Sequence, residues 1–199
     1  MSSYTESIEK LIEKLVKLPG IGRRSAERVI AYILDAPKDE VKLLSEGIIA
    51  VKENVRFCNI CHNLSENDLC KICSDSRRKK NLICVVEKPG DVTAIEKAGD
   101  FDGVYHVLMG SISPLEGRGP GDLKIGTLVN RIKENLASEI IIATDADTEG
   151  ETTAMYLTKI LKPLGIRLSR IGLGLPVGSN LEFADSATLT KAIQSRRDI

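Results

Sequence analysis

A chain of 199 residues allows one medium domain with a small appendage or two small domains in tandem, and we favour a modular chain. Its hydrophobic share of 42% and charged share of 28% are ordinary for globular proteins and exclude extensive disorder. Because 28 Lys and Arg balance 28 Asp and Glu, net charge does not indicate a nucleic-acid partner. Aromatic residues are only 4% of the chain and Trp is absent, which argues against a surface that stacks on the bases of single strands.

The first ten residues, MSSYTESIEK, lack the apolar stretch of a secretory signal. No uninterrupted apolar run is long enough to span a bilayer, so we expect a cytoplasmic protein without a membrane partner. In a reducing compartment the five cysteines are not expected to form a disulfide framework. We expect Cys84, which lies in the apolar run 82–86, to be a buried core thiol.

Three helical patterns occupy the first part of the chain. Ser3 and Glu6 have capping-box spacing ahead of the first, and Ser25 is expected to cap the second. The apolar positions of the three patterns are, in order, Ile8, Leu11, Ile12 and Leu15; Val29, Ile30, Ile33 and Leu34; and Val41, Leu44, Ile48, Val51 and Val55. Residues 1–54 are therefore predicted to form a helical domain with a three-helix core, marginally stable alone and leaning on a partner surface.

Strand and helix patterns alternate in the second half of the chain. The predicted strands are 82–86, 104–108, 139–144 and 166–173, and the predicted helices are 121–136 and 149–161. Such alternation implies a mainly parallel, doubly wound sheet. The predicted fold class is multi-domain α+β. Its parts are a helical domain at 1–54, a four-cysteine module at 55–78, an α/β domain at 79–173 and a C-terminal assembly segment at 174–199, with one short helix at 187–194.

The segment Leu-Pro-Gly-Ile-Gly at residues 18–22 joins the first two helical patterns. Its glycines permit a turn whose backbone N–H groups point outward above the start of the second helix, a geometry that suits a phosphate. Arg23, Arg24 and Arg28 follow, so amides and guanidinium groups would converge on one DNA strand without reading its bases. The segment resembles the hairpin of helix-hairpin-helix proteins, and the alternative is a plain turn with a solvated basic face.

Cys58, Cys61, Cys70 and Cys73 form a Cys-x2-Cys-x8-Cys-x2-Cys cluster. Two such turns bring four thiolates to one tetrahedral Zn²⁺, and four protein ligands leave no open position, so a structural zinc site is predicted. Two disulfides or unligated cysteines are the alternative. His62 adjoins the cluster as a competing ligand, but the four sulfurs are complete without it. The metal would stabilise a segment too small to fold alone.

Glu87 follows the first predicted strand of the sheet, and Asp145 and Asp147 follow a later one. The ends of parallel strands meet at one edge, where three carboxylates are suited to Mg²⁺. This arrangement resembles the Toprim domain of topoisomerases, primases and some nucleases. Two other interpretations stay open: Asp147 caps the next helix within a solvated acidic rim, or the rim, with Glu149, docks a basic protein partner.

Two weaker signals flank these motifs. The basic run at residues 77–80 joins the cysteine module to the sheet and is either a solvated linker or a phosphate contact. The glycine-rich run at residues 117–121 lacks the Gly-Lys-Ser/Thr ending of a nucleotide-binding loop, so ATP hydrolysis is not predicted.

The order of these motifs resembles the RecR family of bacterial recombination-repair proteins. The stretches that carry the resemblance are Leu-Pro-Gly-Ile-Gly, the cysteine cluster, Glu-Lys-Pro-Gly-Asp at 87–91, Gly-Ser-Ile-Ser-Pro-Leu at 110–115, Asp-x-Asp at 145–147 and Gly-Leu-Pro-Val-Gly at 174–178. Together they cover essentially the whole chain. Many members of the family lack part of the Asp-x-Asp pair, whereas this chain keeps it, so a residual Mg²⁺ site stays open.

The resemblance implies a non-enzymatic mediator that binds DNA without sequence preference, works with RecO and RecF, and helps to load the recombinase onto single-stranded gaps. It also implies a dimer to tetramer ring that encircles DNA, in the bacterial cytoplasm and at the nucleoid during repair. Carried onto this chain, the DNA contacts are Gly20, Gly22, Arg23, Arg24 and Arg28, and the zinc ligands are Cys58, Cys61, Cys70 and Cys73. A Mg²⁺-dependent Toprim nuclease or topoisomerase-like enzyme is the alternative function.

Overall fold

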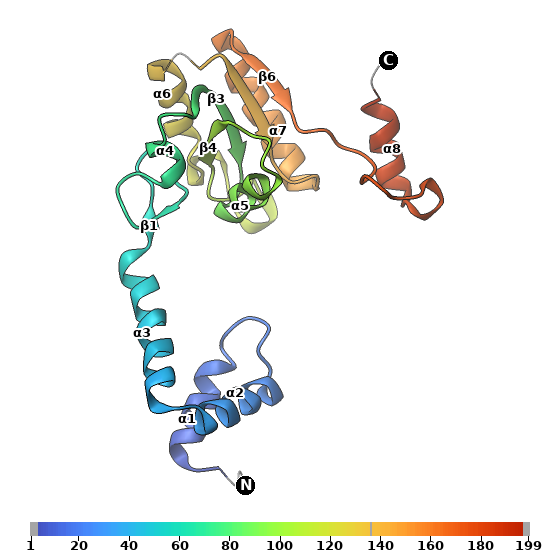
Figure 1. The fold of residues 1–199 in the computed structure, drawn as a ribbon. Coiled ribbons are helices and arrows are strands. Elements are labelled where there is room, and N and C mark those ends of the chain that lie inside the picture. Colours follow the sequence, from blue (N-terminus) through green and yellow to red (C-terminus); the bar gives the residue numbers. More distant parts are fainter. Residues whose placement is uncertain (1–3, 136, 197–199) are drawn as a thin grey trace. The chain divides into compact units, whose positions relative to one another are not determined.

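The computed structural model describes residues 4–135 and 137–196 and divides into two compact units, Met1–Val55 and Arg56–Ile199 (Figure 1). The smaller unit contains α1 (Glu6–Leu15), α2 (Arg23–Asp35) and α3 (Lys38–Asn54). Nowhere in the described ranges is there a helix with the length and apolar character needed to cross a bilayer.

The core of the smaller unit lies between α1 and α2. Ile12, Ala26 and Ile30 are buried there, with Ile8, Leu11, Leu15 and Ile21 packed against them. The third helix buries no residue, so the prediction of a three-helix core is wrong. The reason is the extended backbone at Ala36 and Pro37, which directs α3 away from the α1 and α2 pair. The apolar stripe of α3 is consequently exposed within this unit.

The predicted caps of the first two helices also need correction. Gly22, with extended backbone, is the N-cap of α2, and Ser25 lies inside the helix, so the prediction of a Ser25 cap is wrong. Because the turn ends at Gly22, the helix begins at Arg23, two residues before Ser25. Helix α1 begins after Thr5, whose side chain makes no capping hydrogen bond. The predicted Ser3 cap falls outside the described residues.

The larger unit begins with the cysteine-rich segment and continues into a four-stranded parallel sheet. In the cysteine-rich segment, β1 (Arg56–Phe57) pairs antiparallel with β2 (Leu64–Ser65), and α4 (Lys71–Ser74) follows. The sheet has the order β4-β3-β5-β6, formed by β3 (Lys79–Val86), β4 (Gly103–Val107), β5 (Glu139–Ala143) and β6 (Arg167–Arg170). Its helices are α5 (Pro89–Ala98), α6 (Ile125–Asn135) and α7 (Thr148–Leu161), and the short turns are η1 (Pro114–Glu116), η2 (Pro120–Asp122) and η3 (Lys162–Leu164).

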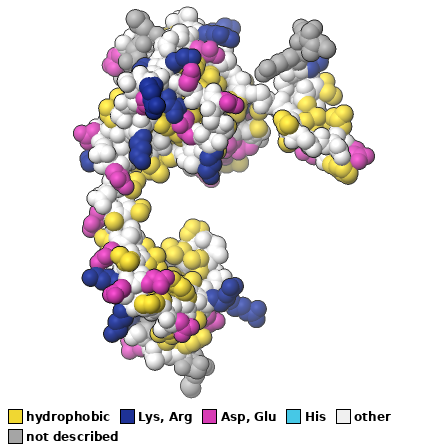
Figure 2. Space-filling model, viewed as in Figure 1, with side chains coloured by type: hydrophobic (Ala, Val, Ile, Leu, Met, Phe, Trp, Pro, Cys, Tyr) yellow, Lys and Arg dark blue, Asp and Glu magenta, His cyan; other side chains and the backbone are white. Residues whose placement is uncertain are grey.

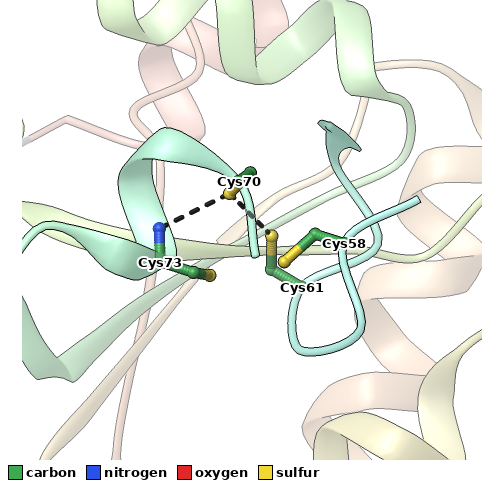
Figure 3. A group of neighbouring side chains, drawn as sticks. All are labelled: Cys58, Cys61, Cys70 and Cys73. Atoms are coloured by element: carbon green, nitrogen blue, oxygen red, sulfur yellow. Dashed lines mark hydrogen bonds between the residues drawn. The ribbon is translucent and has the colours of Figure 1, made fainter. Parts of the chain in front are cut away.

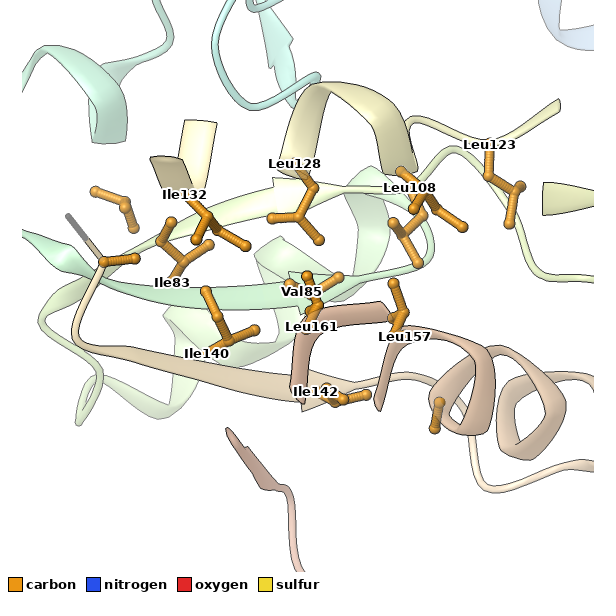
Figure 4. Close-up of a cluster of buried hydrophobic side chains, with 14 of the residues drawn as sticks. Ile83, Val85, Leu108, Leu123, Leu128, Ile132, Ile140, Ile142, Leu157 and Leu161 are labelled. Carbon is orange, nitrogen blue, oxygen red and sulfur yellow. The ribbon is translucent and has the colours of Figure 1, made fainter. Parts of the chain in front are cut away.

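Strand β3 runs through the middle of the sheet and is buried on both faces, as central parallel strands are. Ile83 and Val85 point into the larger core, which α6 and α7 cover (Figure 4). Cys84 and Val86 point into a smaller core on the α5 side. The period of two along the strand therefore separates two hydrophobic layers. Cys84 is a buried free thiol, as predicted.

The mixed α+β fold class and the parallel sheet are confirmed, with differences at element ends. The predicted helix 121–136 begins only at Ile125, because η2 takes up residues 120–122, and the predicted strand 166–173 is limited to β6. Helix α5 was not predicted, because Val92 is its only buried described residue and its apolar spacing is weak. Its start was readable from Pro89 at the first position and from Asp91, whose carboxylate accepts the Lys88 N–H.

Beyond the sheet, η4 (Leu181–Phe183) and α8 (Ser186–Gln194) form the C-terminal segment. Asp185 caps α8 by accepting the Thr188 N–H at 2.9 Å. Lys191 Nζ pairs with Glu151 on α7 at 2.9 Å, and the same carboxylate pairs with Arg170 at the end of β6. These ion pairs attach the C-terminal helix to the α/β domain.

Leucine truncation at matched buried and exposed positions tests the core. Leu157→Ala removes a fully buried side chain from the larger core and should lower the free energy of unfolding by about 2–5 kcal/mol. Leu115→Ala removes a side chain that is 99% exposed and should change it by less than about 0.5 kcal/mol. Chemical denaturation followed by far-UV circular dichroism measures both, and equal losses would contradict this core.

Candidate functional site

The four cysteines converge on one buried point between β1 and α4 (Figure 3). Their ligand atoms all lie within 4.8 Å of one another, and the Cys61 and Cys70 sulfurs are 3.5 Å apart. The first pair sits on a tight turn in which the His62 N–H donates to the Cys58 carbonyl at 3.0 Å. In the second pair, Cys70 caps α4 and its sulfur accepts the Cys73 N–H at 3.4 Å. The geometry is that of two knuckles facing a single metal ion.

The electrostatics of this cluster favour a cation at its centre. Hydrogen bonds from the thiols of Cys61 and Cys73 lower the pKa of Cys70. The same hydrogen bond to Cys70 raises the pKa of Cys61 far above its ordinary range. The thiolate of Cys70 is therefore stabilised by hydrogen bonds from neighbouring thiols. A bound divalent metal would displace those thiol protons and stabilise the thiolates by its own positive charge. Four closely spaced thiolate donors fit Zn²⁺.

His62 does not belong to the ligand group. Its ring Nε2 lies 3.0 Å from Thr127 Oγ1 on α6, and its backbone has the left-handed φ of 62°. Burial is the main cause that lowers its pKa, followed by the charges of Lys124 and Arg131. The competing histidine ligand considered from the sequence therefore connects the cysteine module to the α/β domain instead.

The basic run at residues 77–80 is the first half of β3 and the residues just before it, and all four of its side chains are paired. The ion pairs are Arg77–Asp75 at 2.9 Å, Arg78–Glu96 at 2.5 Å and Lys79–Asp102 at 2.6 Å. Lys80 Nζ donates to the carbonyls of Cys73 and Asp75, at 2.7 and 2.8 Å, where α4 ends. Lys80 therefore attaches the cysteine module to the sheet, whereas the side chains of Arg77 and Lys79 are 89% and 63% exposed and fit the solvated linker considered from the sequence. The phosphate contact stays a prediction.

The hairpin between α1 and α2 has the backbone geometry of an anion site. Gly20 has a φ of +79°, a conformation that favours glycine, and a Cβ on Gly20 or Gly22 would meet nothing within 4 Å. In the described part of the chain, the N–H groups of residues 23–25 donate to no backbone carbonyl. These are the open donors of a helix N-terminus, which attract phosphate.

The three arginines after the hairpin differ in their surroundings. Arg23 donates to both carboxylate oxygens of Glu9, at 2.9 and 3.1 Å, and to Glu27 at 3.2 Å. The hydrogen bond to Glu9 is the main cause that raises the pKa of Arg23. Arg24 and Arg28 are exposed, and among the described residues neither forms an ion pair. They stand one helical turn apart on α2 and therefore share a face.

The acidic residues gather at the carboxyl edge of the sheet, where β3 and β5 end side by side. Glu87 is only 2% exposed, and its Oε1 accepts the Asp145 N–H at 3.0 Å. Asp147 caps α7 by accepting the Gly150 N–H at 2.7 Å, so the capping role considered from the sequence is observed. Within the described ranges, however, the four cysteines are the only group of three or more metal-ligating side chains within 4.8 Å.

Glu149 is held by a loop whose chemistry the sequence analysis did not recognise. Its two carboxylate oxygens accept hydrogen bonds from Ser111 at 3.2 Å and Ser113 at 2.5 Å. The neighbouring turn depends on Gly150, because a Cβ there would lie 2.1 Å from the Asp145 carbonyl oxygen. The available signals were Gly150, which directly follows the acidic residues at 145–149, and the two serines that flank Ile112.

Burial governs the protonation of Glu87. Loss of solvent is the main cause that raises its pKa, and the nearby charges of Asp145 and Asp147 act in the same direction. The Asp145 N–H opposes this effect. A carboxyl group with a raised pKa at the end of a strand is suited to proton transfer or to a cation that would neutralise it.

Four family models match successive parts of the chain. A RecR helix-hairpin-helix model matches residues 8–52, and a model of the RecR zinc finger domain with four cysteines matches residues 55–75. A Toprim domain model matches residues 81–172, and a model described as RecR, C-terminal matches residues 174–197. The zinc finger match and the convergence of the sulfurs together support a structural zinc site.

The pH dependence of stability tests the burial of Glu87. A carboxyl group whose folded-state pKa is raised stabilises the fold at low pH, and this contribution is lost as pH rises through the folded pKa. Glu87→Gln keeps an acceptor for the Asp145 N–H without the charge. We expect the variant to be at least as stable as the original chain at neutral pH. Its advantage should shrink as pH falls toward the ordinary value of 4.5.

Thermal denaturation of both proteins across this pH range measures the difference. A stability difference that does not vary with pH would contradict a raised pKa for Glu87.

Proposed function

The chain belongs to the RecR family of recombination-repair proteins, and we propose that it acts there as a mediator that binds DNA without reading its sequence. The observation that carries the DNA contact is the hairpin at Gly20 and Gly22. Open backbone N–H groups at the start of α2 lie next to the exposed charges of Arg24 and Arg28, which form no ion pair with any residue that the structure describes. Backbone donors with nearby guanidinium groups bind phosphates and carry no base information.

Arg23 has a second role in this proposal. Its pairs with Glu9 on α1 and Glu27 on α2 connect the two helices that flank the hairpin. Exposed ion pairs of this kind exchange readily, so Arg23 contributes to phosphate binding only when it leaves these carboxylates. Arg24 and Arg28 therefore supply the larger share of the affinity for DNA.

The proposal includes a homo-oligomer, from a dimer up to a tetramer ring that encloses DNA. Two apolar surfaces support it. Helix α3 exposes Leu44, Ile48 and Val51 by 51–65%. The C-terminal segment exposes Val177, Leu181 and Phe183 by at least 65%, and Figure 2 shows hydrophobic side chains gathered on it. A second copy of the chain is a partner that would cover both, and enclosure would retain DNA despite few phosphate contacts.

We further propose that the protein works with RecO and RecF and helps to load the recombinase onto single-stranded gaps, in the bacterial cytoplasm and at the nucleoid during repair. The acidic edge is the surface that suits a basic partner. Asp145 and Asp147 are exposed there, and Ser111 and Ser113 fix the carboxylate of Glu149 beside them. A fixed and partly exposed negative surface supports electrostatic steering of such a partner.

A second candidate function is a Mg²⁺-dependent nuclease or topoisomerase-like enzyme. The observation that favours it is the shared position of Glu87, Asp145 and Asp147 at the ends of two neighbouring strands. Hard carboxylate oxygens suit Mg²⁺, which would need only one or two of them with several waters. The carboxyl group of Glu87 would then be placed for proton transfer.

Arginine substitutions with a matched control test the DNA contact. Arg24→Ala and Arg28→Ala should each weaken binding to short duplex DNA and lower the slope of log affinity against log salt by about 1. Arg167→Ala, an exposed arginine on β6, should leave both quantities unchanged. Fluorescence anisotropy at several salt concentrations measures them. Unchanged binding by both hairpin variants would remove α2 from the DNA interface.

Incubation with labelled single-stranded, duplex and supercoiled DNA in Mg²⁺ or Mn²⁺ separates the two candidate functions. A mediator should leave all three substrates intact, and gel electrophoresis detects any cleavage or relaxation. An activity that Asp145→Asn abolishes would replace the mediator with the enzyme.

A further inference from the structure

Strand β4 lies at one end of the sheet, yet all five of its residues are buried. An edge strand usually presents a row of unpaired N–H and C=O groups to solvent or to another chain. Alternate residues of a parallel strand point their backbone groups to opposite sides. On the inner side, the Leu108 N–H after β4 donates to the Val86 carbonyl of β3. The groups of Tyr105 and Val107 must therefore point to the open side.

Two contacts occupy that open side at Tyr105 and Val107. The Val107 N–H donates to the carbonyl of Cys61 at 2.8 Å. The Tyr105 carbonyl accepts a hydrogen bond from Arg131 Nη1 on α6 at 2.6 Å. Cys61 belongs to the cysteine module and Arg131 to helix α6. The module therefore supplies the carbonyl that accepts the Val107 N–H at the edge of the sheet.

The Cys61 carbonyl is placed by the knuckle around it. The residue that follows, His62, has a left-handed φ of 62° and contacts Thr127 on α6. Its ring also packs edge-on against His106 of β4, with centroids 5.3 Å apart and an interplanar angle of 88°. The knuckle and β4 are therefore in contact through backbone and side chains at the same place.

Besides the sulfurs, a few hydrogen bonds hold this knuckle, such as the Cys58 N–H to the Asn63 carbonyl at 2.7 Å, and its core is small. Its regular structure consists of two strands of two residues and a helix of four. Apart from the four cysteines, Ile72 is the partly buried hydrophobic residue packed in its cluster. A segment with so small a core folds when a metal joins its ligands. The site fits Zn²⁺, as its sulfur geometry shows.

From this geometry we propose that the cysteine module is a metal-held cover for the edge of β4. With the metal bound, the Cys61 carbonyl stays on the Val107 N–H and the edge is closed. When the metal leaves, the knuckle loses its shape and the edge opens. Ile72 of the module packs against both hydrophobic cores of the sheet, but neither core contains any of the four ligands, so we expect the sheet to persist while its edge is uncovered.

Residue-resolved hydrogen exchange on the full chain tests this role. The Zn²⁺-loaded protein should protect the Val107 amide, and removal of the metal with a chelator under reducing conditions should speed its exchange by about tenfold or more. Amides of the inner strand β5 should keep their protection. Addition of Zn²⁺ should restore slow exchange at Val107.

Two cysteine variants form a matched pair for the same measurement. Cys73→Ser removes a ligand and should open the Val107 amide without a chelator. Cys84→Ala removes a thiol of β3 that is not a ligand but packs in the same cluster as Val107, so continued protection of Val107 in this variant separates ligand loss from a change in packing. If Cys73→Ser fails to fold, chelation of the unchanged chain decides. Continued protection of Val107 after metal removal would overturn the proposal, and so would an equal loss of protection in β5.

Discussion

The parallel pairing of β3 with β4 and β5 is the interaction on which the larger unit depends. It buries β3 on both faces and sets the two hydrophobic layers. It also brings the ends of β3 and β5 together, so that Glu87 accepts the Asp145 N–H. At the other end of the strand, Lys80 holds the end of α4. One strand thus positions both the acidic edge and the cysteine module.

The positively charged side chains differ in whether they pair with carboxylates of the same chain or stay exposed. The basic run at residues 77–80, which had suggested a phosphate contact, is engaged within the molecule. The hairpin arginines Arg24 and Arg28 are exposed without such pairs among the described residues. Density of positive charge in the sequence therefore does not show which cations lack a partner in the fold, because Arg78 pairs with Glu96 and Lys79 with Asp102, which lie farther along the chain.

Sequence reasoning was most successful where the spacing itself fixes the chemistry. Two Cys-x2-Cys turns predicted a sulfur cluster that the fold assembles, and alternating strand and helix patterns predicted the parallel sheet. It failed for α5, whose apolar spacing is weak, and for α3, whose stripe suggested a core that this unit does not contain. The hydrogen bonds from Ser111 and Ser113 to Glu149 were also not predicted, since they join residues more than thirty positions apart.

The two faces of the sheet are unequal, and this asymmetry bears on how the domain fluctuates. Helices α6 and α7 cover the larger core, whereas α5 contributes only Val92 as a fully buried side chain. Local opening costs less free energy where less apolar surface is exposed. We therefore expect the face of the sheet that α5 covers to open more readily than the face that α6 and α7 cover. Since α5 begins two residues after Glu87, the part of the acidic edge that β3 contributes borders this face.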